Sequence, residues 1–287
     1  MFTKILLDKI KKYVFWGIKI TLVIYLIICL YIYINQSKYM YHPSNNIERD
    51  PSSFGINFDQ VTLITEDGVK IVGWFIPAKP SNNSITNHTY TILYCHGNAG
   101  NISEHLEIAI ELIKMNYNVM LFDYRGYGLS EGKPTEIGTY LDAMSTWKYL
   151  TENRGIESNK IIIYGWSLGG SIAAWLATKT KPYALILEST FASAKIMAHR
   201  MFPYLPTKLL CRYNYNTMEY VKNIQCPVLV AHSPQDKTVP FEDSFTILAN
   251  IQTEKEFVRL KGGHNDGRLL LLLDGQKAFD NFIRKKR

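Results

Sequence analysis

Hydrophobic and polar residues follow three different patterns along the chain. Residues 14–34 form an apolar run whose one charged residue is Lys19. Residues 61–65 and 69–75 instead alternate apolar and polar positions around a Glu-Asp-Gly turn, which predicts a β-hairpin. Beyond residue 90, short β-branched runs alternate with longer segments of helical spacing. The pattern therefore predicts an apolar N-terminal helix, a hairpin and an alternating α/β region.

The alternating region predicts a mainly parallel sheet with helices on both faces and the early hairpin at an antiparallel edge, because helical crossovers connect parallel strands. A polar loop at 80–88 precedes it, and no internal repeat interrupts it, so residues 61–287 form one predicted domain. The expected strands are 90–95, 118–123, 160–164, 183–187, 228–232 and 256–260. The expected helices are 103–115, 135–152, 168–180, 241–250 and 268–284.

The N-terminal apolar run has the length and composition of a membrane-spanning helix. About 20 helical residues cross the ~30 Å hydrocarbon layer of a bilayer. Residues 35–38 lack the small-residue pattern of a signal-peptide cleavage site, and the run has almost no polar face for a soluble helix. We therefore expect a basic flank at 1–13, an uncleaved signal anchor at 14–34 that contacts membrane lipid, and a polar juxtamembrane connector at 35–60.

Flanking charge predicts the orientation of this anchor. Lysines occupy positions 4, 9, 11 and 12 before the span, whereas Lys38 and Arg49 follow it more sparsely. Positive charge favours the cytoplasmic side. We therefore expect a single-pass membrane protein with a cytoplasmic N-terminus and a lumenal or extracytoplasmic catalytic domain.

Composition and charge narrow the class further. The apolar fraction of 47% is typical of a globular protein with a sizeable core. The net charge of +7 comes from scattered residues, without a basic stripe interleaved with aromatics, so nucleic acid is not an expected partner. A Cys211–Cys226 disulfide is one alternative for the cysteines, whose spacing is not that of a metal site. Glycosylation sequons begin at Asn82, Asn87 and Asn101.

The clearest chemical signal is the sequence Gly-Trp-Ser-Leu-Gly at residues 165–169. It lies between a β-branched run and a helical segment, which is the strand–turn–helix context of a nucleophile elbow around Ser167. Glycines are expected on either side because a Cβ there would collide with the neighbouring strand and helix. The alternative is a glycine-rich turn whose serine only caps the helix.

Other strand ends supply the remaining parts of a hydrolytic site. Asp236 follows strand 228–232 and His264 follows strand 256–260, in the chain order that a nucleophile, acid and histidine require on this type of fold. The histidine would activate the serine, and the carboxylate would orient the histidine. Glu188 is a rival for the acid, and Asp236 could instead cap the following turn.

The loop at residues 96–101 predicts an oxyanion hole. It follows strand 90–95, contains two glycines and leads into a helix. The backbone N–H of Asn98, paired with that of Leu168, can donate to a developing oxyanion. The alternative is an ordinary helix entry with His96 held in the core.

Five ordered motifs resemble those of α/β-hydrolase-domain proteins, most closely the membrane-associated serine hydrolases that include types thirteen and seventeen and their bacterial and fungal relatives. They lie at residues 96–101, 123–132, 165–170, 236–240 and 263–265, and residues 36–43 are similar to the Tyr- and Pro-containing segment after the anchor. The resemblance implies an α/β-hydrolase fold, with Ser167 as nucleophile, His264 as base, Asp236 as its orienting acid, and the Asn98 and Leu168 amides as oxyanion donors. Type seventeen members are protein depalmitoylases with an N-terminal lipidated cysteine cluster, which this chain lacks.

The expected function is hydrolysis of an acyl ester or thioester, of a lipid or an acylated protein, through a Ser-His-Asp triad without a metal or organic cofactor. Residues 191–226, called here the lid segment, lie where lids occur on this fold. Its apolar residues predict a wall for an acyl chain, or alternatively a helix that only packs on the sheet. Two other functions remain open: an aminopeptidase-like peptidase, which needs an acidic anchor for the substrate amine, and a non-catalytic binding protein. The predicted substrate-binding residues are Trp166, Met197, Met201 and Phe202.

Overall fold

The β-branched runs of the chain assemble into one eight-stranded sheet, in the order β10-β9-β8-β7-β4-β6-β3-β2. A computed structural model describes residues 2–78 and 89–285; the predicted polar loop at 80–88 and the sequons at Asn82 and Asn87 lie outside them. The strands are β2 (Asp59–Ile64), β3 (Lys70–Ile76), β4 (Thr91–Cys95), β6 (Asn118–Phe122), β7 (Ile161–Trp166), β8 (Ala184–Glu188), β9 (Val228–His232) and β10 (Lys255–Arg259).

The pairing of these strands confirms the predicted sheet. Neighbours from β6 through β10 are parallel, whereas β2 pairs antiparallel with β3, and β3 antiparallel with β6. The hairpin of β2 and β3 therefore forms the antiparallel edge. Every residue of β4, β8 and β9 is buried, as expected for strands covered on both faces.

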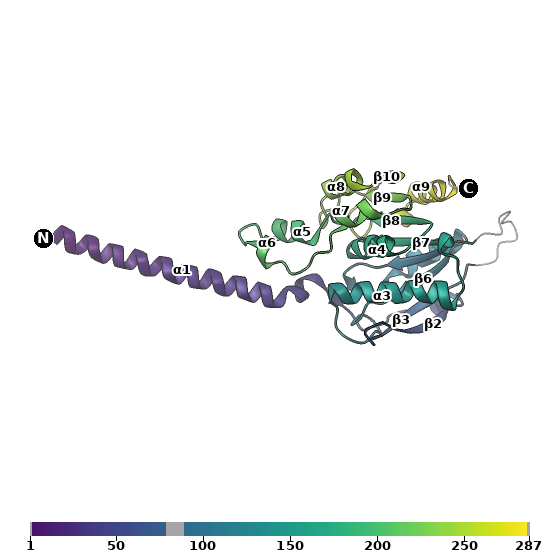
Figure 1. The fold of residues 1–287 in the computed structure, drawn as a ribbon, viewed down its shortest axis with the longest axis horizontal. Coiled ribbons are helices and arrows are strands. Elements are labelled where there is room, and N and C mark those ends of the chain that lie inside the picture. Colours follow the sequence, from purple (N-terminus) through teal and green to yellow (C-terminus); the bar gives the residue numbers. More distant parts are fainter. Residues whose placement is uncertain (1, 79–88, 286–287) are drawn as a thin grey trace.

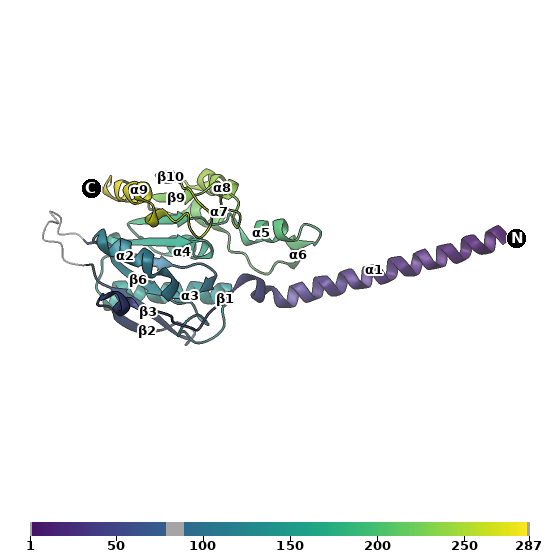
Figure 2. The same cartoon turned by 180° about the vertical axis from the view of Figure 1, so that it is seen from behind.

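Helices cover both faces of the sheet (Figures 1 and 2). Apolar residues of α3, α4 and α8 pack in one core, and those of α2 and α9 in the other. The parallel carboxyl ends of β4, β7, β8, β9 and β10 consequently open toward one edge, where ligands bind in sheets of this kind. The helices are α2 (Leu106–Lys114), α3 (Glu136–Lys148), α4 (Leu168–Lys179), α8 (Glu242–Asn250) and α9 (Leu273–Arg284).

Helix boundaries differ from the predictions at three places. A 3₁₀ turn, Ile102–His105, precedes α2, and a π turn, Tyr149–Asn153, follows α3. The last helix begins at Leu273 instead of 268, which corrects the predicted boundary. A 3₁₀ turn, Leu269–Leu271, precedes it, and the Arg268 side chain is buried in an ion pair with Glu188.

The N-terminal helix is longer than the predicted anchor. Helix α1 spans Phe2–Met40, 39 residues, and projects from the domain (Figure 1). Within it, residues 3–40 are apolar and long enough to cross a membrane by length and composition, and 6% of the most apolar window is buried in the protein. Helix α1 thus continues through residues 35–40, the first part of the predicted polar connector.

The chain after α1 joins the domain instead of merely linking it. Strand β1 (His42–Pro43) pairs in parallel with β5 (Ala99–Gly100), in the loop that follows β4. The His42 N–H donates to the carbonyl of Asn98 at 2.8 Å. The segment that follows α1 therefore holds the loop predicted to carry an oxyanion donor.

The lid segment lies beside the end of α1. It contains α5 (Ala194–Met201), α6 (Thr207–Leu210) and α7 (Thr217–Tyr220), and α5 and α6 project in the direction of α1 (Figure 2). All four cysteines are free, so Cys211 and Cys226 form no disulfide. The side chain of Asn101 is buried and donates to the carbonyls of Ser44 and Asn46, which makes this sequon inaccessible in the folded domain.

Candidate active site

The turn between β7 and α4 holds Ser167 in a strained conformation. Its φ and ψ angles are 55° and −121°, in a region that non-glycine residues rarely occupy. The Ser167 N–H donates to the carbonyl of Glu188, and the hydroxyl of Thr190 donates to the carbonyl of Ser167 at 2.7 Å. Two residues at and just after the end of β8 thus hold the backbone of Ser167 in place.

The flanking glycines have the steric role that the sequence predicts. A Cβ on Gly165 would collide with the backbone of α4, and one on Gly169 would collide with the backbone of Cys95. The side chain of Ser167 caps no helix N–H, so the alternative interpretation as a simple helix cap is wrong. Its hydroxyl is instead directed toward a histidine.

Ser167, His264 and Asp236 meet although they are far apart in sequence. Nε2 of His264 lies 3.0 Å from Oγ of Ser167, and Nδ1 lies 2.6 Å from Oδ2 of Asp236. One imidazole therefore bridges a hydroxyl and a carboxylate. This arrangement can accept the serine proton at one nitrogen while the other stays hydrogen-bonded to the acid.

Asp236 is held as a carboxylate by several donors. Its Oδ1 accepts the backbone N–H groups of Thr238 and Val239 at 2.8 and 2.9 Å, so it caps the following turn as well as contacting His264. Burial alone would raise the pKa of Asp236, but hydrogen bonds from His232 and His264 and from the Val239 amide outweigh it and lower the pKa well below the usual value. The acid is therefore ionised at neutral pH.

Glu188, the rival acid, is engaged elsewhere. Its Oε1 accepts from Nε of Arg268 at 3.0 Å and from the N–H of Leu269 at 2.7 Å. Its Oε2 accepts the hydroxyl proton of Tyr164 at 2.6 Å. The structure thus brings Asp236 to the histidine and leaves Glu188 in a buried ion pair beneath it.

Trp166 lies beside the histidine and does not line the apolar cavity that adjoins Ser167. Its ring centroid is 5.2 Å from that of His264 and 4.1 Å from the guanidinium carbon of Arg268. The described residues that line the cavity do not include it. Its predicted role in substrate binding is therefore not supported; it packs against the imidazole.

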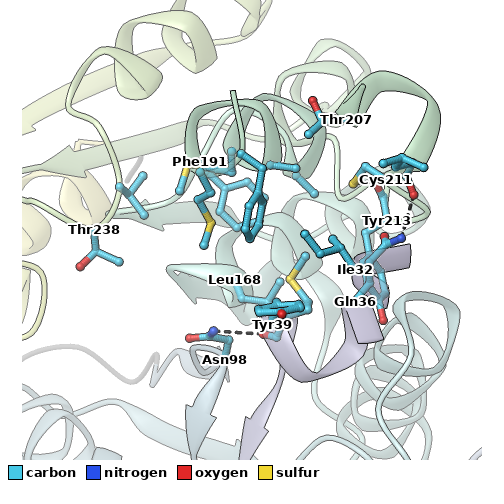
Figure 3. Close-up of a pocket in the computed structure, with 18 of the residues that line it drawn as sticks. Ile32, Gln36, Tyr39, Asn98, Leu168, Phe191, Thr207, Cys211, Tyr213 and Thr238 are labelled. Atoms are coloured by element: carbon cyan, nitrogen blue, oxygen red, sulfur yellow. Dashed lines mark hydrogen bonds between the residues drawn. The ribbon is translucent and has the colours of Figure 1, made fainter. Parts of the chain in front are cut away.

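The loop after β4 is fixed from both sides. The Asn98 carbonyl accepts from the His42 N–H and from the hydroxyl of Tyr127, and the Asn98 side chain donates to the carbonyl of Met40 at 3.0 Å. His96 is fully buried, as the alternative interpretation of this loop expected, and burial lowers its pKa to about 4. Asn98 and Leu168 line the same cavity as Ser167 (Figure 3).

A mostly apolar cavity of about 370 Å³ adjoins the serine. Met197, Met201 and Phe202 line it as predicted, together with Phe191 and other residues of the lid segment. Its size is within the usual range for small-molecule pockets. Ile32, Gln36, Tyr39 and Met40 of α1 form another part of its wall (Figure 3).

Two groups of residues at this site were not predicted from the sequence. His232 ends β9, and its Nε2 lies 3.3 Å from Oδ2 of Asp236; its position at a strand end, four residues before the acid, is the available signal. The α1 residues of the cavity wall were assigned to the anchor or connector, since nothing local indicates that the helix end returns to the site. For residues 36–43, the available sequence signal was their resemblance to the family's Tyr- and Pro-containing segment.

An eight-stranded sheet of this order, with a strained serine turn after β7, is an α/β-hydrolase fold. Residues 108–267 match the prolyl oligopeptidase family. The chain is 32% identical to uncharacterized protein Rv2307c of Mycobacterium tuberculosis, over 88% of this chain and 89% of that one. It is 34% identical to the α/β-hydrolase-domain-containing protein WAV2 of Arabidopsis thaliana, over 71% and 72% respectively.

A solved structure is similar in fold. The esterase Pf2001 of Pyrococcus furiosus superposes with a TM-score of 0.68 at 22% identity, covering 86% of this chain and 97% of that one. Because the family match spans residues 108–267, more than half of the chain, the protein belongs to the prolyl oligopeptidase family of α/β hydrolases. The predicted fold class and family resemblance are confirmed.

Proposed function

We propose that this protein is a membrane-anchored serine hydrolase that cleaves carboxylic ester or thioester bonds of acyl substrates. The observation that supports it most directly is the pair of contacts made by His264, at 3.0 Å to Ser167 and 2.6 Å to Asp236. The apolar cavity beside the serine supports an acyl group as the part of the substrate that is bound.

In the proposed reaction, Oγ of Ser167 attacks the acyl carbon while Nε2 of His264 takes its proton. Asp236 stabilises the imidazolium that forms. The backbone N–H groups of Asn98 and Leu168 donate to the oxyanion, each typically worth about 3–4 kcal/mol in a site of this kind. His264 then protonates the leaving alcohol or thiol, and water, deprotonated by the same imidazole, releases the acid and regenerates the serine.

The cavity favours an ester or thioester over a peptide with a free amino terminus. A peptidase of the aminopeptidase type needs a carboxylate to bind the substrate amine. The described residues that line the cavity include neither Asp nor Glu, and Met, Phe, Leu, Ile, Val and Ala supply more than half of them. A non-catalytic binding protein would have no use for backbone strain at Ser167.

The anchoring by α1 is part of this proposal, with residues 14–34 in the bilayer. The lysines before the span favour a cytoplasmic N-terminus and an extracytoplasmic domain. Protease treatment of intact membrane vesicles of known orientation tests this topology. We expect the domain to be protected where the lumenal side is enclosed, and digestion from the cytoplasmic side would overturn it.

A fluorophosphonate probe tests the nucleophile directly, because it captures an activated serine without requiring the natural substrate. The full-length protein should be labelled, and Ser167→Ala should not. Ser171→Ala, at a buried serine of α4, is the matched control and should be labelled like the wild type. Equal labelling of wild type and Ser167→Ala would reject the assignment.

A further inference from the structure

Three apolar side chains of the lid segment are exposed at the end that projects beside α1. The exposed fractions are 58% for Met201, 90% for Tyr204 and 85% for Leu209. They lie in α5, in α6 and in the connection between these helices, away from the sheet (Figure 1). A cluster of this kind marks a surface that contacts something other than water.

A contact with α1 indicates how deep this end of the lid segment would lie in a bilayer that α1 spans. The hydroxyl of Tyr25 donates to the carbonyl of Tyr204 at 3.1 Å. Tyr25 is nine residues before the end of the 14–34 span, which corresponds to roughly 14 Å along a helix. With residues 14–34 in the hydrocarbon layer, Tyr204 therefore lies at a depth occupied by acyl chains.

The backbone at this end is suited to an apolar surrounding. The Leu205 N–H donates to the carbonyl of Phe202, and that of Thr207 to the carbonyl of Leu205. Pro203 and Pro206 have no N–H to satisfy. Since unpaired backbone groups are costly in lipid, these hydrogen bonds and the Tyr25 contact lower the cost of insertion.

The charges of residues 194–210 are also those of an interfacial segment. They include Lys195, Arg200 and Lys208 but no Asp or Glu. Long cationic side chains can extend to the headgroups while their stems stay in apolar surroundings. Arg200 is paired with Asp243 of α8, so Lys195 and Lys208 are the cations beside the apolar tip that can reach phosphate.

The cavity continues from the serine to the same surface. Ile32, inside the predicted span, and Leu205, beside the apolar tip, both line it. Gln36 ties the two walls together: its Nε2 donates to the Leu210 carbonyl at 2.7 Å and its Oε1 accepts the Arg212 N–H at 2.8 Å. Figure 3 shows Ile32 and Gln36 of α1 across the cavity from Phe191 and Thr207.

We propose that the α5–α6 end of the lid segment is inserted in the bilayer beside α1, and that the cavity takes the acyl chain of a membrane-resident ester or thioester laterally from the lipid. This inference rests on the proposed hydrolase function and names its substrate class. An acyl chain entering in this way stays in apolar surroundings from the bilayer to Ser167, so it never crosses water.

Fluorescence of an environment-sensitive label tests the insertion without any use of catalysis. Leu209→Cys is labelled with NBD in the full-length protein, in a Cys29→Ala, Cys211→Ser background, and reconstituted in dioleoylphosphatidylcholine vesicles. Leu273→Cys is the matched control, because Leu273 is 75% exposed on α9, outside the lid segment. We expect blue-shifted emission and quenching by doxyl-labelled lipid at position 209 and water-like emission at 273; water-like emission at both overturns the insertion.

Hydrolysis tests the lateral entry. Leu209 does not line the cavity, so Leu209→Asp should leave hydrolysis of soluble 4-methylumbelliferyl butyrate unchanged while slowing that of vesicle-embedded 4-methylumbelliferyl oleate at least tenfold. Leu273→Asp should change neither rate. Equal rates of oleate hydrolysis in Leu209→Asp and wild type would contradict lateral entry alone. A wild type that hydrolyses neither ester and resists fluorophosphonate would instead reject the proposed function, whatever the NBD result.

Discussion

Nε of Arg268 lies 3.0 Å from Oε1 of Glu188, and this buried ion pair lies directly behind the proposed catalytic site. Arg268 also stacks on Trp166, whose ring contacts His264. Arg268 follows His264 by four residues and Glu188 ends β8, so the ion pair connects the loop that carries His264 to β8. The ion pair also engages Glu188, which the sequence offered as a rival to Asp236 for the acid of the site.

Substitution of the two acids should separate their roles. Asp236→Asn keeps the shape but removes the charge that stabilises the imidazolium, so kcat for an ester should fall about 10⁴-fold, as for the equivalent change in serine proteases. Glu188→Gln should instead lower stability by roughly 3–5 kcal/mol, because it leaves Arg268 buried without its partner. Ester kinetics and thermal melting of both variants measure this, and equal kcat losses would contradict the assignment of the acid.

Gln36→Leu should loosen the lid segment from α1. The substitution leaves the Leu210 carbonyl and the Arg212 N–H without their side-chain partner, at roughly 1–3 kcal/mol for each group that stays buried. We expect faster proteolysis within residues 194–212 in detergent, measured by mass spectrometry of the fragments. Gln276→Leu on α9 is the control, and it should leave cleavage of the lid segment unchanged.

Met197→Trp should shorten the acyl chain that the enzyme accepts, since the larger ring fills part of the cavity. In a series of p-nitrophenyl esters from acetate to decanoate, kcat/KM should fall at least tenfold more for decanoate than for acetate. Leu209→Trp, outside the cavity wall, is the control in detergent. A uniform loss across the series would show that Met197 does not set chain length, and a wild type with no preference beyond acetate would reject the acyl cavity.

The domain should lose stability as the pH rises from 6.5 to 8. Burial raises the pKa of Asp123 to about 8, whereas an unfolded Asp titrates near 3.9. The folded state therefore retains a proton that the unfolded chain has released, and raising the pH costs about 2 kcal/mol across this window. The depressed pKa of His96 acts in the opposite direction, but only below about pH 6.5, where unfolded histidine is protonated.

Thermal melting of the full-length protein in detergent measures this slope. The wild-type Tm should fall by several degrees between pH 6.5 and 8. Asp123→Asn, which can still accept the Ile102 N–H, should be nearly flat over the same range. An equal slope in both proteins would show that Asp123 does not hold the proton.

Much of the fold followed from local patterns in the sequence. The period of apolar residues and the turn signals place β4, β6, β7, β8, β9 and β10 within two residues of the observed ends, because each pattern reports which faces of a segment are buried. The strand–turn–helix around Ser167 was predictable for the same reason, and its glycines indicated a close approach of backbones. Asp236 and His264 were found because the carboxyl ends of parallel strands share one edge of the sheet.

The tertiary structure alone decided the rest, since it depends on contacts between residues far apart in the chain. Gln36 meets Leu210 and Tyr25 meets Tyr204 across more than 170 positions, and no local pattern encodes such pairs. The same holds for Arg268 and Glu188, which form a buried ion pair across 80 positions. The sequence thus determined the chemical groups and the sheet, whereas long-range packing determined which acid reaches His264 and that helix α1 forms part of the cavity wall.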